Sequence, residues 1–249
     1  MKPHAIAPAV WLTLALAAPV ASHAEAANDP FEGWNRAVYR LNDGIDTVIL
    51  KPLARGYQAV VPELARTGVS NFFGNIGDVW SAVNNLLQGK GEAAATMLFR
   101  FGTNTLFGIG GLFDVASDLG MERKSEDFGQ TLGVWGLPAG PYTVLPLLGP
   151  SSLRDTAGLT LDLQAGVGAY SHDRRATNSL TALQLVDTRA NLLTASKMLD
   201  DIALDKYSFV RDAYLSRRRN QVYDGDPPPL PEEKDNKDDA AVPAPAPPK

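Results

Sequence analysis

The chain has 249 residues, a formal net charge of −5 at pH 7 and no cysteine. The acidic balance argues against a nucleic-acid-binding protein, which would show a basic patch. The lack of cysteine excludes thiol catalysis, disulfides, thiolate metal sites and cysteine lipidation. With 45% hydrophobic residues the chain can build a sizeable core, and its length allows one or two domains.

The first 26 residues predict a secretory signal peptide. A basic start at Lys2 precedes an apolar run over residues 5–20, and small-x-small sequences end at Ala24 and Ala26. We expect cleavage after Ala24 or Ala26, which leaves an exported protein with a single folded domain at residues 27–223. An uncleaved anchor helix is the alternative for this segment.

Residues 27–48 predict an amphipathic helix. Asp29, Pro30 and Glu32 suit its start as a cap, a first helical residue and a capping-box partner. Apolar residues then recur at steps of three and four, which places them on one helical face. The helix is either an ordinary core helix or one that lies in a membrane interface. The membrane-interface hypothesis names Trp34, Val38, Leu41 and Ile45.

Helical periodicity continues over the next part of the chain. We expect a break at Pro52, then a helix that begins at Pro62 and has a joint at residues 74–78. A further helix is expected at residues 92–101. The uncharged residues 101–113 are too short and too rich in glycine for a spanning helix. They also lack the fingerprint of a phosphate-binding loop.

Residues 128–153 contain no charged residue, a length that could cross a bilayer as a helix. Nine glycines and prolines interrupt this apolar run, so we expect no continuous helix. An irregular segment exposed to lipid would leave backbone amides unpaired. The apolar run is therefore either a core segment with turns or the lining of an apolar passage.

The last third of the chain predicts three more helices. The first covers residues 153–170 after a capping-box sequence, and the others lie near 180–193 and 207–214. Few segments alternate in the manner of strands, so the fold class is mostly α. From residue 224 the composition shifts to proline and acidic residues, and we expect a disordered tail over 224–249. A proline-rich ligand for a partner is the alternative for the tail.

Candidate catalytic residues are few. After signal cleavage His172 is the one histidine left, and its polar neighbours indicate a solvated loop. The sequence around Ser151 lacks the last glycine of a hydrolase elbow. No carboxylate–histidine cluster offers a metal site. We predict a protein that is not an enzyme, with no catalytic residue, metal or cofactor; a lipid hydrolase that uses His172 or Ser151 is a rival.

The chain resembles the VacJ-like, or MlaA, outer-membrane lipoproteins of Gram-negative bacteria over residues 28–218. Ordered sequence matches carry this resemblance, and the most specific lie in and around the apolar run. They are DPFEGWNR at 29–36, NFFGN at 71–75, NNLLQG at 84–89, DFGQTLG at 127–133, GPY at 140–142, GP at 149–150 and LRD at 153–155.

The resemblance implies a ring-like assembly of short amphipathic helices with glycine- and proline-rich apolar joints. Such a protein would lie in the inner leaflet of the outer membrane and associate with a trimeric porin. It would carry stray phospholipid from the outer leaflet through an amphipathic passage to a soluble periplasmic carrier, which maintains lipid asymmetry. On this basis the apolar run supplies the passage or its gate, with Trp135, Tyr142, Leu145, Leu147 and Leu148. The hinge hypothesis names Gly133, Gly136 and Gly140.

The chain departs from this family at the cysteine that usually follows the signal, since residues 24–28 read AEAAN. We therefore expect it to be held at the periplasmic side of the outer membrane without an acyl anchor, by amphipathic helices and partners. A soluble periplasmic lipid-binding shuttle is the alternative. An envelope-structuring protein without lipid cargo is a further rival.

Overall fold

The structure is a computed structural model that describes residues 29–166, 168 and 173–229. The expected signal peptide, His172 and most of the expected tail lie outside the described residues. The first tail residues are tied to the domain, because Asp224 pairs with Lys90 at 2.5 Å and the Pro228 carbonyl accepts from Arg219.

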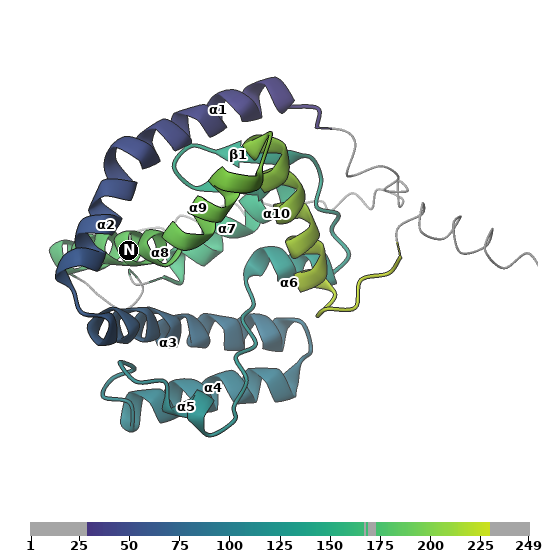
Figure 1. The fold of residues 1–249 in the computed structure, drawn as a ribbon. Coiled ribbons are helices and arrows are strands. Elements are labelled where there is room, and N and C mark those ends of the chain that lie inside the picture. The colour runs from purple at the N-terminus through teal and green to yellow at the C-terminus, as the bar shows by residue number, and fades with distance from the viewer. Residues whose placement is uncertain (1–28, 167, 169–172, 230–249) are drawn as a thin grey trace, which may run out of the picture.

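The N-terminal elements form one helical arch: α1 (Glu32–Ile45), the π-helical turn η1 (Asp46–Leu50) and α2 (Lys51–Val60) (Figure 1). The predicted break at Pro52 is wrong, because Pro52 lies in the first turn of α2. The Lys51 amide reaches back five residues to the Asp46 carbonyl. This wider turn directly before Pro52 accommodates a residue that has no N–H to donate.

The predicted capping box at the start of α1 is confirmed in part. The Asp29 carboxylate accepts from the Phe31 amide and the Asn35 side chain, but Glu32 pairs with Arg36 at 2.7 Å and does not reach back to Asp29.

Helices α3 (Glu63–Leu87) and α4 (Gly91–Leu106) pack as a hairpin, followed by the short helix α5 (Val115–Asp118). The predicted joint at residues 74–78 is absent, and α3 runs through it without a break. Gly74 has a packing role, because a Cβ there would lie 2.7 Å from Arg123 Nη1. Helix α4 likewise continues past its expected end at residue 101.

The apolar run forms no continuous helix, as predicted. It contains helix α6 (Phe128–Val134) and then strands β1 (Tyr142–Leu145) and β2 (Gly149–Ser152). The strands form an antiparallel hairpin in which Tyr142 faces Ser152 and Leu145 faces Gly149. The strands were not predicted, because four residues each are too few for a period-two pattern to stand out.

The remaining helices are α7 (Leu153–Gln164), α8 (Arg174–Asn191), α9 (Leu193–Ile202) and α10 (Lys206–Val222). The predicted capping box before α7 is confirmed in part, since the Ser152 side chain accepts from the Asp155 amide. Asp187 of α8 fixes this helix to α2 and α3 by accepting from Tyr57 at 3.0 Å and Ser70 at 2.6 Å.

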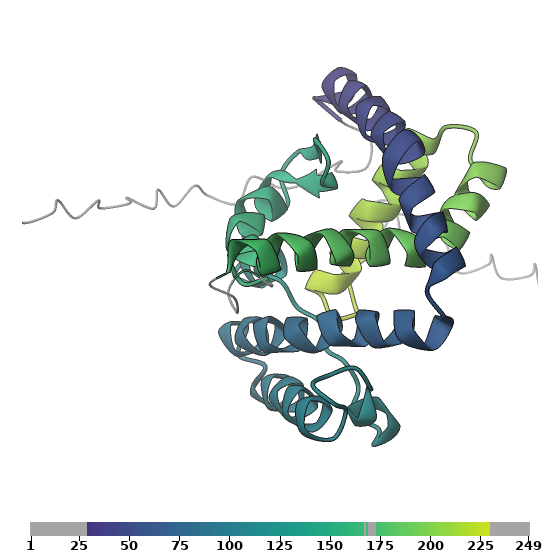
Figure 2. The ribbon, with the colours of Figure 1, turned by 90° about the vertical axis from the view of Figure 1, so that its left-hand side faces the viewer.

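The fold is mostly α, as predicted, and its elements follow one another around a ring, as the family resemblance implied. In Figure 1, α1 runs along the top, α2 lies at the left, α3 and α4 cross the bottom, and α6 and α10 close the right side. Figure 2 shows α8 running across between α7 and α2. Within the described ranges, no helix has both the length and the apolar character needed to cross a bilayer.

The buried core of the described residues contains many polar side chains. The main apolar cluster is small and comprises Val38, Tyr142, Val144 and Tyr207. Many large apolar side chains lie on the surface instead, while Arg100 and several asparagines are fully buried. These apolar side chains remain exposed after folding, which is typical of surfaces that contact another apolar phase.

Candidate functional site

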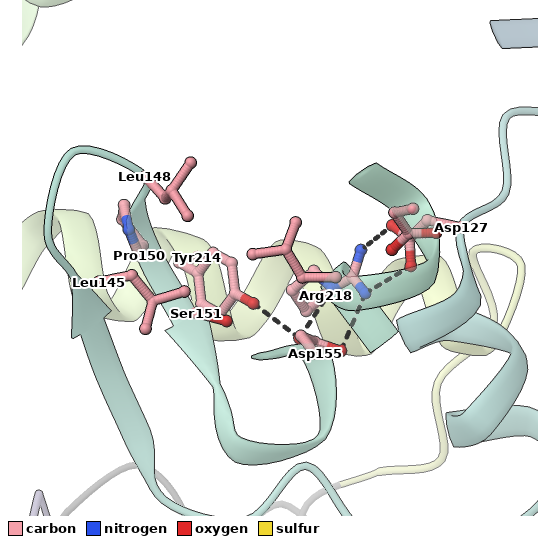
Figure 3. Close-up of a pocket in the computed structure, with 10 residues that line it drawn as sticks. Asp127, Leu145, Leu148, Pro150, Ser151, Asp155, Tyr214 and Arg218 are labelled. Carbon is pink, nitrogen blue, oxygen red and sulfur yellow. Dashed lines mark hydrogen bonds and ion pairs between the residues drawn. The ribbon is translucent and has the colours of Figure 1, made fainter. Parts of the chain in front are cut away.

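A cleft of about 200 Å³ lies where the β1–β2 hairpin meets α6, α7 and α10 (Figure 3). Its two sides differ in chemistry. Apolar side chains, most of them from the hairpin, line one part of the cleft. Charged and hydroxyl groups from β2, α7, α10 and the start of α6 line the rest. The lining residues are Leu145, Leu148, Pro150, Leu159, Ser151, Tyr214, Asp127, Asp155, Asp162 and Arg218.

The tip of the hairpin exposes two adjacent leucines. Leu147 is 68% exposed and Leu148 is 57% exposed. Leu147 has a φ of +66°, a left-handed conformation that costs a residue with a Cβ about 1–2 kcal/mol. An exposed leucine in a strained conformation does not stabilise the fold, and such strain concentrates at functional segments.

Two asparagines of α1 hold the hairpin by its β1 edge. The Asn35 side chain accepts from the Val144 amide at 2.8 Å and donates to the Tyr142 carbonyl at 3.1 Å. The Asn42 side chain accepts from the Leu147 amide at 2.8 Å and donates to the Leu145 carbonyl at 2.9 Å.

The spacing of these asparagines matches the strand. Seven residues of helix advance about 10.5 Å, and three residues of strand advance about 10 Å. Two asparagines two turns apart on α1 therefore satisfy successive polar groups along the strand edge. The clamp fixes the position of the hairpin tip relative to α1.

Arg218 of α10 organises the charged side of the cleft. Its guanidinium contacts Asp127 at 2.5 and 2.9 Å and Asp155 at 2.9 and 3.0 Å. Tyr214 also donates to Asp155 at 2.6 Å. The cluster ties the start of α6, the start of α7 and the end of α10 together (Figure 3).

This pairing shifts the acidity of both aspartates. Burial would raise the pKa of Asp155, but hydrogen bonds from Arg218 outweigh it and lower the pKa to about 2. The pKa of Asp127 is lowered for the same reason. Burial would lower the pKa of Arg218, and its bonds to the two aspartates raise it instead. All three groups are therefore charged at neutral pH.

Two glycines make this arrangement possible. A Cβ on Gly129 would lie 2.6 Å from Asp155 Oδ1, and a Cβ on Gly158 would lie 2.6 Å from the Gly129 amide nitrogen. Helices α6 and α7 thus approach with their backbones nearly in contact, which only glycine permits. Asp162 completes the cleft and accepts from Trp80 Nε1 at 2.7 Å.

The structure brings together part of the predicted gate. Leu145 and Leu148 line the cleft, and Leu147 lies beside them at the hairpin tip. Tyr142 is 4% exposed and belongs to the apolar core, so it does not face a passage. Trp135 lies at the end of α6, where its Nε1 donates to the Leu87 carbonyl at 3.0 Å.

The four residues predicted to face the membrane on α1 differ in exposure. Trp34 and Leu41 are exposed and Ile45 is half-buried, whereas Val38 is buried in the core beside Tyr142. Val38 is therefore removed from the membrane-interface hypothesis.

The three predicted hinge glycines have different surroundings. Gly136 and Gly140 have positive φ values of +91° and +68°, which suit turns. A Cβ on Gly133 would lie 2.8 Å from Arg154 Nη1, so its small size permits close packing.

Sequence reasoning missed the charged side of the cleft and the asparagine clamp. One signal was present: the uncharged run begins directly after Asp127 and ends directly before Arg154 and Asp155. Arg154 and Asp155 are buried, and buried charges need partners. The sequence gives no sign that Arg218, 63 residues after Asp155, supplies one.

Comparison with known proteins now decides the family. The family model described as "MlaA lipoprotein" matches residues 27–221. The chain belongs to the MlaA lipoprotein family. The MlaA family resemblance predicted from the sequence is thus confirmed.

Curated MlaA proteins are similar to the chain over most of its length. The intermembrane phospholipid transport system lipoprotein MlaA of Escherichia coli (strain K12) is 36% identical over 194 residues, which cover 76% of each chain. The protein of the same name from Haemophilus influenzae is 33% identical over 208 residues, or 80% of each chain.

A solved structure also matches the fold. It is described as "Structural basis for maintenance of bacterial outer membrane lipid asymmetry" and superposes with a TM-score of 0.69 at 35% sequence identity. The match covers 78% of this chain and 99% of the other. The helical MlaA fold therefore accounts for nearly the whole described part.

Proposed function

We propose that this protein takes part in retrograde phospholipid transport and so maintains the lipid asymmetry of the outer membrane. Membership of the MlaA family carries this proposal, because its named relatives belong to an intermembrane phospholipid transport system. Stray phospholipid leaves the outer leaflet through an amphipathic passage and is handed to a soluble periplasmic carrier. The protein acts as a transport component and performs no covalent chemistry.

The two-sided cleft supports a passage of this kind. A phospholipid that crosses a bilayer has to keep its polar headgroup hydrogen-bonded, because burying an unpaired polar group costs roughly 2–7 kcal/mol. Arg218, Asp127 and Asp155 offer polar partners on one side of the cleft, while Leu145 and Leu148 offer an apolar surface.

The size of the cleft limits what it can hold. Its volume of about 200 Å³ suits the headgroup of a lipid better than its acyl chains. The cleft is thus a narrow point of the passage, and the hairpin tip with Leu147 and Leu148 acts as its gate.

The protein works at the periplasmic side of the outer membrane, in association with a trimeric porin. Exposed apolar side chains such as Trp34 and Leu41 on α1 support a membrane contact. Extraction of isolated membranes tests this location: an inserted protein resists high salt and needs detergent. Release by salt alone would favour a soluble shuttle.

Outer-leaflet phospholipid in a deletion strain tests the function. An impermeant amine-reactive label should detect more phospholipid at the surface after deletion, and complementation with this chain should reverse the increase. Variants Leu147→Asp and Leu148→Asp should accumulate normally and fail to complement. An unchanged surface after deletion would contradict the transport role, and loss of the variants by proteolysis would contradict the gate.

A further inference from the structure

Asp29, just before α1, contacts more of the molecule than the start of a helix requires. Its carboxylate accepts from the Phe31 amide at 3.1 Å, from Asn35 Nδ2 of α1 at 2.9 Å and from the Tyr207 hydroxyl of α10. A helix cap needs only the first of these bonds. The other two join Asp29 to the asparagine clamp of the hairpin and to the first turn of α10.

The bond from Asn35 fixes the direction in which the clamp amide faces. Asn35 is fully buried, and its Nδ2 donates to both Asp29 and the Tyr142 carbonyl, while its Oδ1 accepts from the Val144 amide. A rotated amide would set its oxygen against the Asp29 carboxylate, and two acceptors form no hydrogen bond. Without Asp29, the closed clamp would hold one buried N–H that has no partner. Such a group costs free energy, so the closed clamp would become less stable.

The bond from Tyr207 connects the same carboxylate to the charged side of the cleft. The Tyr207 ring packs edge-on against Tyr142 of β1, with ring centroids 6.2 Å apart, and both side chains are buried. Helix α10 also carries Tyr214 and Arg218, which line the cleft. Asp29 is therefore bonded both to the clamp that holds the hairpin and to the helix that the hairpin faces.

We infer that Asp29 is a positioning residue that sets the spacing between the hairpin and α10, and with it the width of the cleft. It lies outside the cleft lining and acts through Asn35 and Tyr207. The consequence for transport rests on the proposed role of the hairpin as a gate. The spacing itself is a property of the protein alone and is measured without lipid.

Hydrogen exchange at the Val144 amide tests the clamp. Val144 is 1% exposed, and its acceptor, Asn35 Oδ1, is still present in Asp29→Ala. Exchange in this variant therefore reports opening of the clamp, and it should accelerate roughly 5- to 150-fold. In Asp29→Asn the side-chain oxygen still accepts from Asn35, so exchange should stay near that of the unmodified protein. Unchanged exchange in Asp29→Ala would overturn the inference.

Spin-label distances test the spacing. Because the chain has no cysteine, Pro146→Cys at the hairpin tip and Ser216→Cys on the exposed side of α10 provide a unique pair of labels. Asp29→Ala should broaden the distribution of distances between them, and Asp29→Asn should keep it narrow. The matched control Tyr57→Phe removes a bond to an aspartate elsewhere, at 3.0 Å from Asp187, and should also keep it narrow. Equal broadening in the control would indicate a general loss of stability and overturn the inference.

The variant Tyr207→Phe tests the α10 contact separately. It keeps the aromatic ring and removes only the hydroxyl that donates to Asp29. The label distances should broaden, while exchange at Val144 should change much less than in Asp29→Ala, because Asn35 keeps its partner. A narrow distribution in Tyr207→Phe would overturn the claim that Asp29 holds the hairpin against α10.

Complementation of the deletion strain connects the spacing to transport. Asp29→Ala should accumulate and leave outer-leaflet phospholipid raised, whereas Asp29→Asn should restore the low level. Full complementation by Asp29→Ala, with its hairpin released, would overturn the positioning role in transport. A surface that deletion itself leaves unchanged would contradict the proposed function instead, and exchange and distances would still decide whether Asp29 sets the spacing.

Discussion

The substitution Asn42→Ala should release the hairpin tip from α1. Asn42 supplies two hydrogen bonds to the hairpin, at 2.9 Å to the Leu145 carbonyl and 2.8 Å to the Leu147 amide. Net values of about 0.5–1.5 kcal/mol per bond give about 1–3 kcal/mol in total. The open hairpin should then be roughly 5 to 150 times more populated, since 1.4 kcal/mol corresponds to a factor of ten.

The Leu147 amide reports this change directly. In the folded protein it is protected by Asn42, so its hydrogen exchange requires the tip to leave α1. In Asn42→Ala the Leu147 amide also loses its acceptor, so its exchange should accelerate by at least this factor. Amides of the α3–α4 hairpin should keep their exchange rates.

The matched control is Asp43→Ala, the next residue on α1, whose side chain is exposed. It should leave exchange at Leu147 unchanged. If Asn42→Ala fails to accelerate exchange at Leu147, the clamp does not hold the tip and the reasoning is refuted.

Three further predictions concern the charged cluster and its packing. Arg218→Met leaves Asp127 and Asp155 without their shared partner and should lower the free energy of unfolding by about 3–5 kcal/mol in denaturant titrations; a smaller loss than 1 kcal/mol would contradict the pairing. The folded-state pKa of Asp155 is about 2, below the ordinary 3.8, so its contribution is present above pH 4 and is lost as the pH falls toward 2. That contribution is about 2 kcal/mol, and Asp155→Asn should flatten the acid limb of the stability–pH curve. Gly129→Ala should destabilise the protein because its Cβ would meet Asp155 at 2.6 Å, whereas Gly44→Ala, with open space around it, should stabilise α1 by about 0.5–1 kcal/mol; equal effects on the melting temperature would contradict this.

Periodicity and breakers predicted much of the fold, because they are local. The glycines and prolines of residues 128–153 ruled out a spanning helix, and the steps of three and four located α1 and α8. The same local rules failed where tertiary contacts determine the backbone conformation. Gly74 was interpreted as a joint, but it lies inside α3 and makes room for Arg123. Pro52 was interpreted as a break, but a π-helical turn absorbs it.

Sequence reasoning reached only the apolar side of the cleft. It named Leu145, Leu147 and Leu148 because an uncharged run is visible in the sequence, and their role as a gate stays a prediction. The partners of the hairpin were not, because Asn42 and Arg218 are far from it in sequence and carry no local pattern. Tyr142 and Val38 were predicted to face lipid, but both belong to the apolar core. The sequence pattern alone does not distinguish an apolar core residue from one that faces lipid.

Photocrosslinking at Leu148 tests most directly the claim that lipid passes the hairpin cleft. A photoreactive amino acid at residue 148, activated in intact cells, should capture phospholipid, and the same group at Ser216 on α10 should not. Phospholipid captured at 148 and absent at 216 is the result that the account predicts. A residue 148 that captures no phospholipid, in a protein that folds and reaches the outer membrane, would contradict it.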